Sequence, residues 1–217
     1  MIILFDLDGT LIDSTKAIVG TFHYSFDIHN YQRPESIEIE ELIGYPLDVM
    51  YSRLGVPESD VWTFVATYKK RYREIFTQET KMLASAREAV EKASKFATLG
   101  IVTTKTGKYS KLLMEHFELM HYFEVLIGRE DVENPKPDKE PILKAIEALN
   151  IANDKDIWMI GDTKLDLQSA KNAKVNSIGV LTGYGSKEVL QKFTTLIYPD
   201  ALDAVNYLHS RKISHIL

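Results

Sequence analysis

The sequence predicts an α/β protein in which a Rossmann-like parallel sheet, with helices on both faces, carries an inserted, all-α cap of the four-helix type. Three observations predict this fold. A short apolar run at residues 2–5 has the pattern of a buried strand. From about residue 82 onward, strand-like apolar runs alternate with helical patterns, which is typical of βαβ units. Between these two regions, residues 14–81 carry helical patterns only.

The composition permits a sizeable core and excludes several kinds of site. The chain has 217 residues, of which 45% are hydrophobic, and its net charge of −5 gives no attraction for nucleic acid or for an acidic membrane surface. Cysteine is absent, so disulfides and zinc–thiolate sites are excluded. No apolar stretch has the length of a membrane span, and no basic segment precedes Ile2. We therefore expect a cytoplasmic monomer or homodimer whose partner is a small molecule.

The inserted region should form a bundle of about four helices. Apolar residues recur there at helical spacing, and proline or glycine turns separate the segments. The helical patterns cover residues 15–28, 35–43, 46–54 and 58–76. We expect Trp62 and the aromatic residues from Phe64 to Phe76 in the bundle core. Short loops at both ends would let this cap, residues 14–81, move against a core domain made of residues 1–13 and 82–217.

The rest of the chain supplies the remaining strands and helices of the core domain. Strands are expected at residues 98–103, 123–127, 157–160 and 177–181. Helices are expected at residues 85–95, 108–119, 139–149, 163–173 and 201–210. Trp158 lies inside an apolar strand, so we expect it to pack against the sheet.

Acidic and hydroxyl side chains stand where these strands end. Asp6 and Asp8 follow the first strand, Thr103 and Thr104 the second, and Asp162 a later one, with Asp166 one helical turn beyond it. Lys136 precedes a helix. Because the carboxyl ends of parallel strands meet at one edge of a sheet, these residues should converge in one crevice. Taken alone, the Asp-Leu-Asp-Gly-Thr run would also fit a strand that ends in a solvated turn.

Such a crevice suits phosphoryl transfer. Crowded carboxylates repel one another and need a cation, and oxygen ligands without cysteine or clustered histidine indicate Mg²⁺. A lysine and a hydroxyl suit phosphate oxygens. One carboxylate can attack phosphorus and form an aspartyl-phosphate. A second carboxylate, one pleat further on, can protonate the leaving alcohol and then activate water.

These residues make the chain resemble the haloacid dehalogenase-like superfamily of phosphatases, and within it the phosphoglycolate phosphatase-like group with an α-helical cap. Four motifs match in order along essentially the whole chain. They are Asp6-Leu-Asp8-Gly-Thr10, Thr103 at the end of Leu-Gly-Ile-Val-Thr, Lys136 in Lys-Pro-Asp, and Gly161-Asp162-Thr-Lys-Leu-Asp166.

The resemblance also implies a role for each matched residue. Asp6 is expected to be the nucleophile and a metal ligand, and Asp8 the general acid and base, with its backbone carbonyl on Mg²⁺. Asp162 is expected to bind Mg²⁺ directly, and Asp166 through water or through the Lys136 network. The residues expected to hold the phosphoryl group are Gly9, Thr103, Thr104 and Lys136.

Three positions of the sequence distinguish between the reactions known in the superfamily. Carbon–halogen hydrolases of this kind lack an acid at that position, so Asp8 favours phosphoryl transfer. Phosphonate hydrolases use a cap lysine, but the chain has no lysine between Lys16 and Lys69. Sugar-phosphate mutases carry a histidine in the first cap helix, where this chain has Ile18. That departure disfavours a mutase without excluding it.

The resemblance implies that the substrate is a small phosphorylated metabolite, with 2-phosphoglycolate as the leading candidate. A phosphomutase or a pyrophosphatase on the same fold is the alternative, and a non-catalytic module is the third. Gly44, Tyr45 and Arg53 are candidates for substrate selection; otherwise they form a helix–helix turn and a solvated helix end. The basic run at residues 69–73 is more often a solvated helix face.

Overall fold

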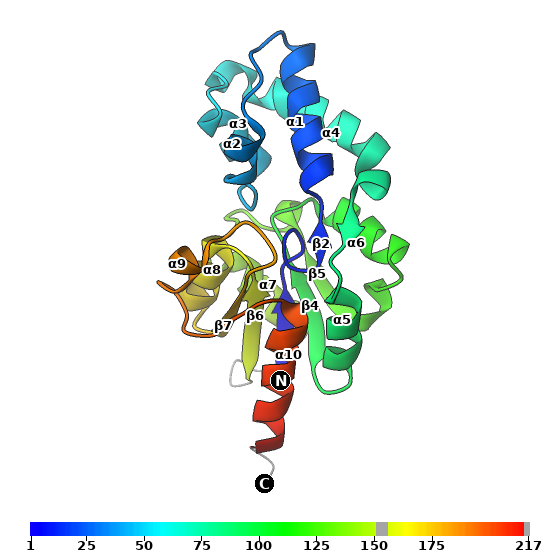
Figure 1. The fold of residues 1–217 in the computed structure, drawn as a ribbon, viewed down its shortest axis with the longest axis vertical. Helices are drawn as coiled ribbons and strands as arrows, with labels where there is room; N and C mark the ends of the chain where they lie inside the picture. The colour runs from blue at the N-terminus through cyan, green and yellow to red at the C-terminus, as the bar shows by residue number, and fades with distance from the viewer. Residues whose placement is uncertain (151–155, 215–217) are drawn as a thin grey trace.

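A six-stranded parallel sheet forms the centre of the molecule. The computed structural model describes residues 1–150 and 156–214, and its strand order is β5-β4-β1-β6-β7-β8 (Figure 1). The strands are β1 (Ile2–Phe5), β4 (Thr98–Val102), β5 (Phe123–Ile127), β6 (Ile157–Gly161), β7 (Asn176–Val180) and β8 (Ile197–Tyr198). β1 lies between β4 and β6 and pairs with both in parallel. The predicted fold class is confirmed.

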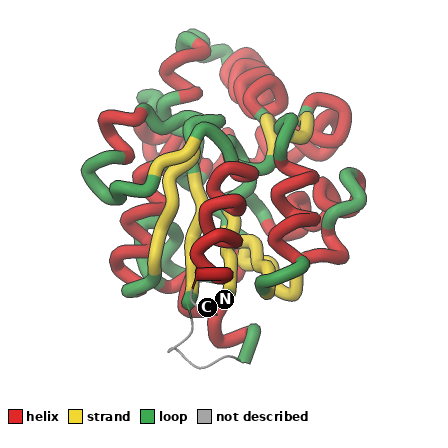
Figure 2. Tube along the Cα trace, turned by 60° about the horizontal axis from the view of Figure 1, so that its bottom comes forward, coloured by secondary structure: helices red, strands yellow, loops and turns green. Residues whose placement is uncertain are grey.

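Helices cover both faces of the sheet (Figure 2). They are α5 (Ala86–Ser94), α6 (Gly107–His116), α7 (Glu140–Ala148), α8 (Lys164–Ala173), α9 (Lys187–Leu190) and α10 (Ala201–Ser214). Successive side chains of a strand point to opposite faces. Ile3 and Phe5 accordingly join the cluster that contains α5 and α10, whereas Ile2 and Leu4 join the cluster under α7. Trp158 is buried against the sheet, as predicted.

Four helices stand above the carboxyl ends of the strands (Figure 1). They are α1 (Thr15–Ile28), α2 (Ser36–Glu40), α3 (Leu47–Arg53) and α4 (Glu58–Glu79). α1 packs along α4. The centre of this group is aromatic: the ring of Phe22 lies 4.5 Å from that of Tyr51 and 5.2 Å from that of Tyr68.

The prediction that Trp62 lies in the bundle core is wrong, because 67% of this residue is exposed. The buried face of α4 runs through Val61, Phe64, Val65, Tyr68, Tyr72 and Phe76. This spacing of three and four residues defines one stripe of the helix. Successive residues of an α-helix are rotated by about 100° around its axis, so the side chain of residue 62 points away from the stripe that contains residue 61.

The chain enters and leaves the helical group through a small antiparallel sheet rather than through the short loops that we expected. β2 (Ile12–Asp13) pairs with β3 (Lys81–Met82), so that Asp13 lies opposite Lys81. Strands of two residues are too short to show an alternating pattern in a sequence. The pair ties the two crossings together directly beside the end of β1.

Candidate active site

Three carboxylates meet beyond the ends of β1 and β6. Each of Asp6, Asp162 and Asp166 offers a carboxylate oxygen within 4.8 Å of the others, and all three residues are buried. Asp6 follows β1, its backbone N–H donates to the Ile160 carbonyl, and Asp162 follows β6. Asp166 lies in the first turn of α8. The adjacent pairing of β1 and β6 brings these three predicted residues together.

Lys136 supplies a positive charge inside this group. Its ammonium nitrogen lies 3.0 Å from Asp6 Oδ1 and 2.5 Å from Asp166 Oδ1, and it donates to the Val102 carbonyl at 3.1 Å. Burial lowers the pKa of Lys136, but Asp166 and Asp6 outweigh burial and raise it above its ordinary value. Lys136 is therefore the charged partner of two carboxylates at once.

One lysine does not balance three buried acids. Burial raises the pKa of Asp6 to about 7; Lys136 opposes this shift, and Asp166 and Asp8 add to it. Burial, with the charges of Asp166 and Asp6, also raises the pKa of Asp162 well above its ordinary value. The positive charge near Asp6 and Asp162 is thus too small to balance the acids, as expected of carboxylates that bind a cation.

The donor set fits Mg²⁺. The buried Asp6 Oδ1 lies at ion-pair distance from Lys136 but accepts no hydrogen bond within the described part of the chain. Mg²⁺ prefers such carboxylate oxygens. Asp162 is oriented by Thr10 Oγ1 at 3.0 Å and by the Tyr184 N–H at 2.9 Å. Asp166 already has a cation, because the Lys136 ammonium group lies 2.5 Å from its Oδ1, whereas the hydrogen bonds to Asp162 come from neutral groups. Asp6 and Asp162 therefore fit direct metal ligation better.

Glycines let the backbone come close to Asp162. Gly9 has a φ of +82°, and a Cβ atom there would lie 2.4 Å from Asp162 Oδ2. A Cβ atom on Gly183 would lie 2.0 Å from the same oxygen. Sequence reasoning missed Gly183 and the Tyr184 amide; the only signal was the Thr-Gly-Tyr-Gly run at residues 182–185 after β7.

Asp8 stands apart from the three carboxylates. Both of its carboxylate oxygens accept hydrogen bonds from Lys105 Nζ at 3.0 Å, and Ser14 Oγ also donates to Asp8 Oδ1. Burial lowers the pKa of Lys105, but Asp8 and Tyr72 outweigh burial and raise it. Sequence reasoning did not give Lys105 a role, because no local pattern shows that it reaches Asp8.

The two threonines after β4 make different contacts. Thr103 is buried, and its hydroxyl oxygen accepts the Lys105 backbone N–H at 3.2 Å. The Thr104 hydroxyl donates to the Gly44 carbonyl at 2.9 Å, between α2 and α3. Thr103 thus stays at the crevice, whereas the Thr104 side chain fastens the helical group to the sheet.

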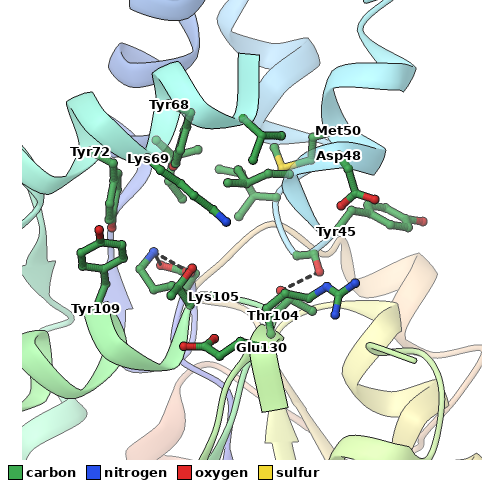
Figure 3. Close-up of a pocket in the computed structure, with 18 of the residues that line it drawn as sticks. Tyr45, Asp48, Met50, Tyr68, Lys69, Tyr72, Thr104, Lys105, Tyr109 and Glu130 are labelled. Atoms are coloured by element: carbon green, nitrogen blue, oxygen red, sulfur yellow. Dashed lines mark hydrogen bonds and ion pairs between the residues drawn. The ribbon is translucent and has the colours of Figure 1, made fainter. Parts of the chain in front are cut away.

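A cavity of about 300 Å³ lies between the helical group and the loops after β4 and β5 (Figure 3). Asp8 lines it, together with Gly44 and Tyr45. Arg53 does not line it: its guanidinium group stacks on the Tyr45 ring at 4.0 Å. Lys69 points into the cavity, so part of the basic run at residues 69–73 faces the crevice (Figure 3).

A comparison with models of known protein families identifies the family of this chain. The family model described as haloacid dehalogenase-like hydrolase matches residues 3–180. The chain belongs to that family. The predicted resemblance is therefore confirmed, and the match includes β1, β6 and the helical group between β2 and β3.

Relatives of this haloacid dehalogenase-like hydrolase are bacterial proteins of similar length. The chain is 33% identical to a protein named pyrophosphatase PpaX from Halalkalibacterium halodurans, over 94% of this chain and 95% of that protein. It is also similar to two solved structures. One is a haloacid dehalogenase-like family hydrolase from Streptococcus pneumoniae, with a TM-score of 0.86, 25% identity and coverage of 95% and 97%. The other is described as a predicted phosphatase from Clostridium acetobutylicum, with a TM-score of 0.87, 27% identity and coverage of 96% and 98%.

Within the described ranges of this haloacid dehalogenase-like hydrolase, no helix is both long and apolar enough to cross a membrane. The site residues predicted from the sequence fall into two neighbouring groups. Asp6, Asp162, Asp166 and Lys136 form one group. Asp8 forms the other with Lys105, which the sequence had not indicated. The cavity adjoins the second group.

Proposed function

We propose that this phosphatase of the haloacid dehalogenase-like family is Mg²⁺-dependent and hydrolyses a small phosphorylated metabolite through an aspartyl-phosphate on Asp6. The observation that carries the proposal is the buried group of Asp6, Asp162 and Asp166 around Lys136. A second carboxylate, Asp8, stands two residues beyond Asp6 and beside a cavity. A nucleophile and a proton carrier at this spacing are what two-step hydrolysis needs.

The first step transfers the phosphoryl group to the enzyme. An Asp6 carboxylate oxygen attacks phosphorus, and the bond between phosphorus and the leaving oxygen breaks. The leaving oxygen takes a proton from Asp8. Lys136 keeps Asp6 in place and offsets negative charge as the phosphoryl group arrives.

The second step returns the enzyme to its starting state. Asp8, now deprotonated, takes a proton from a water molecule whose oxygen attacks the phosphorus of the aspartyl-phosphate. The bond between phosphorus and Asp6 breaks, so that inorganic phosphate leaves and the Asp6 carboxylate is restored. Mg²⁺, held by Asp6 and Asp162, would supply positive charge to the phosphoryl oxygens in both steps.

The remaining predicted residues would hold and select the substrate. We assign the phosphoryl oxygens to the Thr103 hydroxyl, to the backbone amide of Thr104 and to Lys136. The Gly9 N–H already donates to the Ile12 carbonyl at 2.8 Å, so Gly9 would contribute through the close approach of its backbone to Asp162. We propose that residues 14–81 act as a cap. Gly44 and Tyr45 support this role because they line the cavity beside Asp8; Arg53 would act only through its contact with Tyr45.

For the substrate we propose 2-phosphoglycolate, the candidate that the sequence favours. Pyrophosphate is the second candidate, and the 33% identity to a protein named pyrophosphatase supports it. Both are small, and each carries a second anionic group next to the phosphoryl group that is cleaved. A phosphomutase stays the third candidate, to be recognised by a requirement for a bisphosphate activator.

Initial rates of phosphate release across a panel of phosphorylated metabolites test the proposal. The panel contains 2-phosphoglycolate, pyrophosphate, hexose phosphates and nucleotides, each with Mg²⁺ and with a chelator. One substrate that exceeds the others by about a hundredfold in kcat/KM would identify the substrate. Release that does not depend on Mg²⁺ would contradict the role of the metal, and no release from any substrate would favour the mutase.

A further inference from the structure

Lys105 is buried in the crevice next to Asp8 rather than next to the metal-binding group. Only 8% of its side chain and 13% of that of Asp8 are exposed. Its ammonium nitrogen contacts both Asp8 oxygens and lies 4.9 Å above the ring of Tyr72, which belongs to α4. Lys105 thus touches the proposed proton carrier from the sheet side and the cap from the other side.

Lys105 is not needed to neutralise or orient Asp6, Asp162 or Asp166. Lys136 already pairs with Asp6 and Asp166, and Asp162 is oriented by Thr10 and Tyr184. A buried ammonium group is costly unless an anion accompanies it. In this structure Asp8 is that anion, but Asp8 must also reach the leaving oxygen during the reaction. The contact between Lys105 and Asp8 therefore has to change in the catalytic cycle.

The cavity shows where a replacement anion would come from. Asp8 and Lys105 both line it, and the Lys69 side chain points into it from α4 (Figure 3). Glu130, on the wall below, is engaged in accepting the N–H groups of Gly107 and Lys108 at the start of α6. Asp48 lies on the other side of the cavity, near Tyr45 (Figure 3). Two ammonium groups, those of Lys105 and Lys69, therefore line the cavity that Asp8 borders.

We infer that Lys105 binds the second anionic group of the substrate, a carboxylate or a second phosphoryl group, in exchange for Asp8. Asp8 and Lys105 line the cavity whereas Asp6 does not, so a leaving group that extends from a phosphoryl group at Asp6 into the cavity would bring its anion to Lys105. The exchange frees Asp8 from the Lys105 ammonium group, so that Asp8 takes up a proton from water and carries it to the leaving oxygen. Lys105 then selects substrates whose leaving group is itself anionic. This inference rests on the proposed phosphatase function.

Steady-state kinetics of four proteins test this inference. They are the unmodified protein, Lys105→Met, Lys105→Arg and the control Lys108→Met, which removes an exposed lysine outside the cavity. Each receives 2-phosphoglycolate and pyrophosphate, which carry a second anion, and phenyl phosphate, whose leaving group is neutral. Values of kcat and KM are determined separately, because recognition of the second anion acts on KM for the anionic substrates alone.

Lys105→Met is expected to raise KM for the two anionic substrates by about tenfold or more, since a charge-assisted contact is lost. KM for phenyl phosphate should change by less than about twofold. Lys105→Arg should restore most of the affinity for the anionic substrates, and Lys108→Met should behave as the unmodified protein. Equal increases in KM for anionic and neutral substrates would overturn the inference and leave the phosphatase proposal standing.

A binding measurement keeps the inference testable if the unmodified protein hydrolyses none of the three compounds. That outcome would count against the proposed substrates, not against Lys105. Calorimetric titration of 2-phosphoglycolate and of phenyl phosphate, in Mg²⁺, would then compare the unmodified protein with Lys105→Met. A preference for 2-phosphoglycolate that Lys105→Met abolishes supports the inference. A preference that Lys105→Met leaves intact, or the lack of any preference, refutes it.

Discussion

The Thr104 hydroxyl donates a hydrogen bond to the Gly44 carbonyl, 2.9 Å away, and so joins the loop after β4 to the turn between α2 and α3. This bond spans the crevice next to the cavity that contains Asp8. Both residues were expected at the site, Thr104 as a residue that holds the phosphoryl group and Gly44 as a candidate for substrate selection. The bond attaches the helices of residues 14–81, the proposed cap, to the loop after β4 through the Thr104 side chain.

Thr104→Val should loosen this attachment while it keeps the shape of the side chain. A hydrogen bond of this kind contributes about 1 kcal/mol net, so we expect kcat/KM to fall by about fivefold. Amide hydrogen exchange in the turn at residues 43–46 should become faster. Thr63→Val, at an exposed position of α4, is the control. Unchanged kinetics and exchange in Thr104→Val would show that the bond does not position the cap.

Gly183→Ala should disturb the metal site from the neighbouring loop. The added Cβ atom would lie 2.0 Å from Asp162 Oδ2, so the carboxylate or the loop must shift. We expect the affinity for Mg²⁺ to fall by about tenfold to a hundredfold, as when the orientation of a ligand is lost. Gly20→Ala is the matched control, because its Cβ atom would meet nothing within 4 Å. Equal Mg²⁺ affinity in both variants, measured by calorimetry, would rule out a role for Asp162 in binding the metal.

Lys136→Met should leave Asp6 and Asp166 without their common cation. Removal of one partner from a buried ion pair costs about 3–5 kcal/mol, so urea unfolding in a chelator should show a large loss of stability. Mg²⁺ should recover part of that loss by supplying another positive charge. Lys171→Met, at an exposed position of α8, should change the free energy of unfolding by less than about 0.5 kcal/mol. If Lys136→Met were as stable as this control, the ion pairs would contribute nothing.

The raised pKa of Asp6, about 7, predicts how pH affects the metal-free protein. Between the ordinary value of 3.8 and about 7 the folded protein keeps a proton that the unfolded chain has lost. The contribution of this group to the free energy of unfolding therefore falls as the pH rises through that range. Asp162, whose pKa is also raised, acts in the same direction.

Mg²⁺ should reverse this trend, because the ion favours the charged carboxylates. Its dissociation constant should be about tenfold lower at pH 8 than at pH 6, if one proton leaves Asp6 on binding. Thermal unfolding with and without Mg²⁺ at both pH values measures the effect as a larger increase in Tm at pH 8. An increase in Tm that is the same at both pH values would show that the metal does not replace protons on these carboxyl groups.

The sequence predicted those parts of the site that depend on local pattern. A buried strand followed by Asp6 and Asp8, and a second followed by Asp162 with Asp166 one turn on, are visible in the order of residues. The general rule that parallel strands end at one edge then brought these residues together. Segment α1 was predicted with its observed bounds, since its apolar stripe is regular.

The parts that were missed depend on contacts between distant segments. The pairing of β2 with β3 joins residues that are 68 and 70 positions apart. Lys105 and Asp8 are 97 positions apart, and Tyr184 and Asp162 are 22 positions apart. Hydrophobic periodicity predicts local helices and strands, so it does not predict contacts between distant segments. Strand β8 has two residues and joins the sheet only by pairing with β7, so it too had no signal of its own.

The role of Asp6 is tested most directly by the rate of phosphate release from Asp6→Asn, with 2-phosphoglycolate or the best substrate of the panel and saturating Mg²⁺. The amide has nearly the shape of the carboxylate, and thermal unfolding verifies that the variant folds. If Asp6 is the nucleophile, turnover should fall by about a thousandfold or more. A variant that folds normally and releases phosphate at the rate of the unmodified protein would contradict the aspartyl-phosphate mechanism.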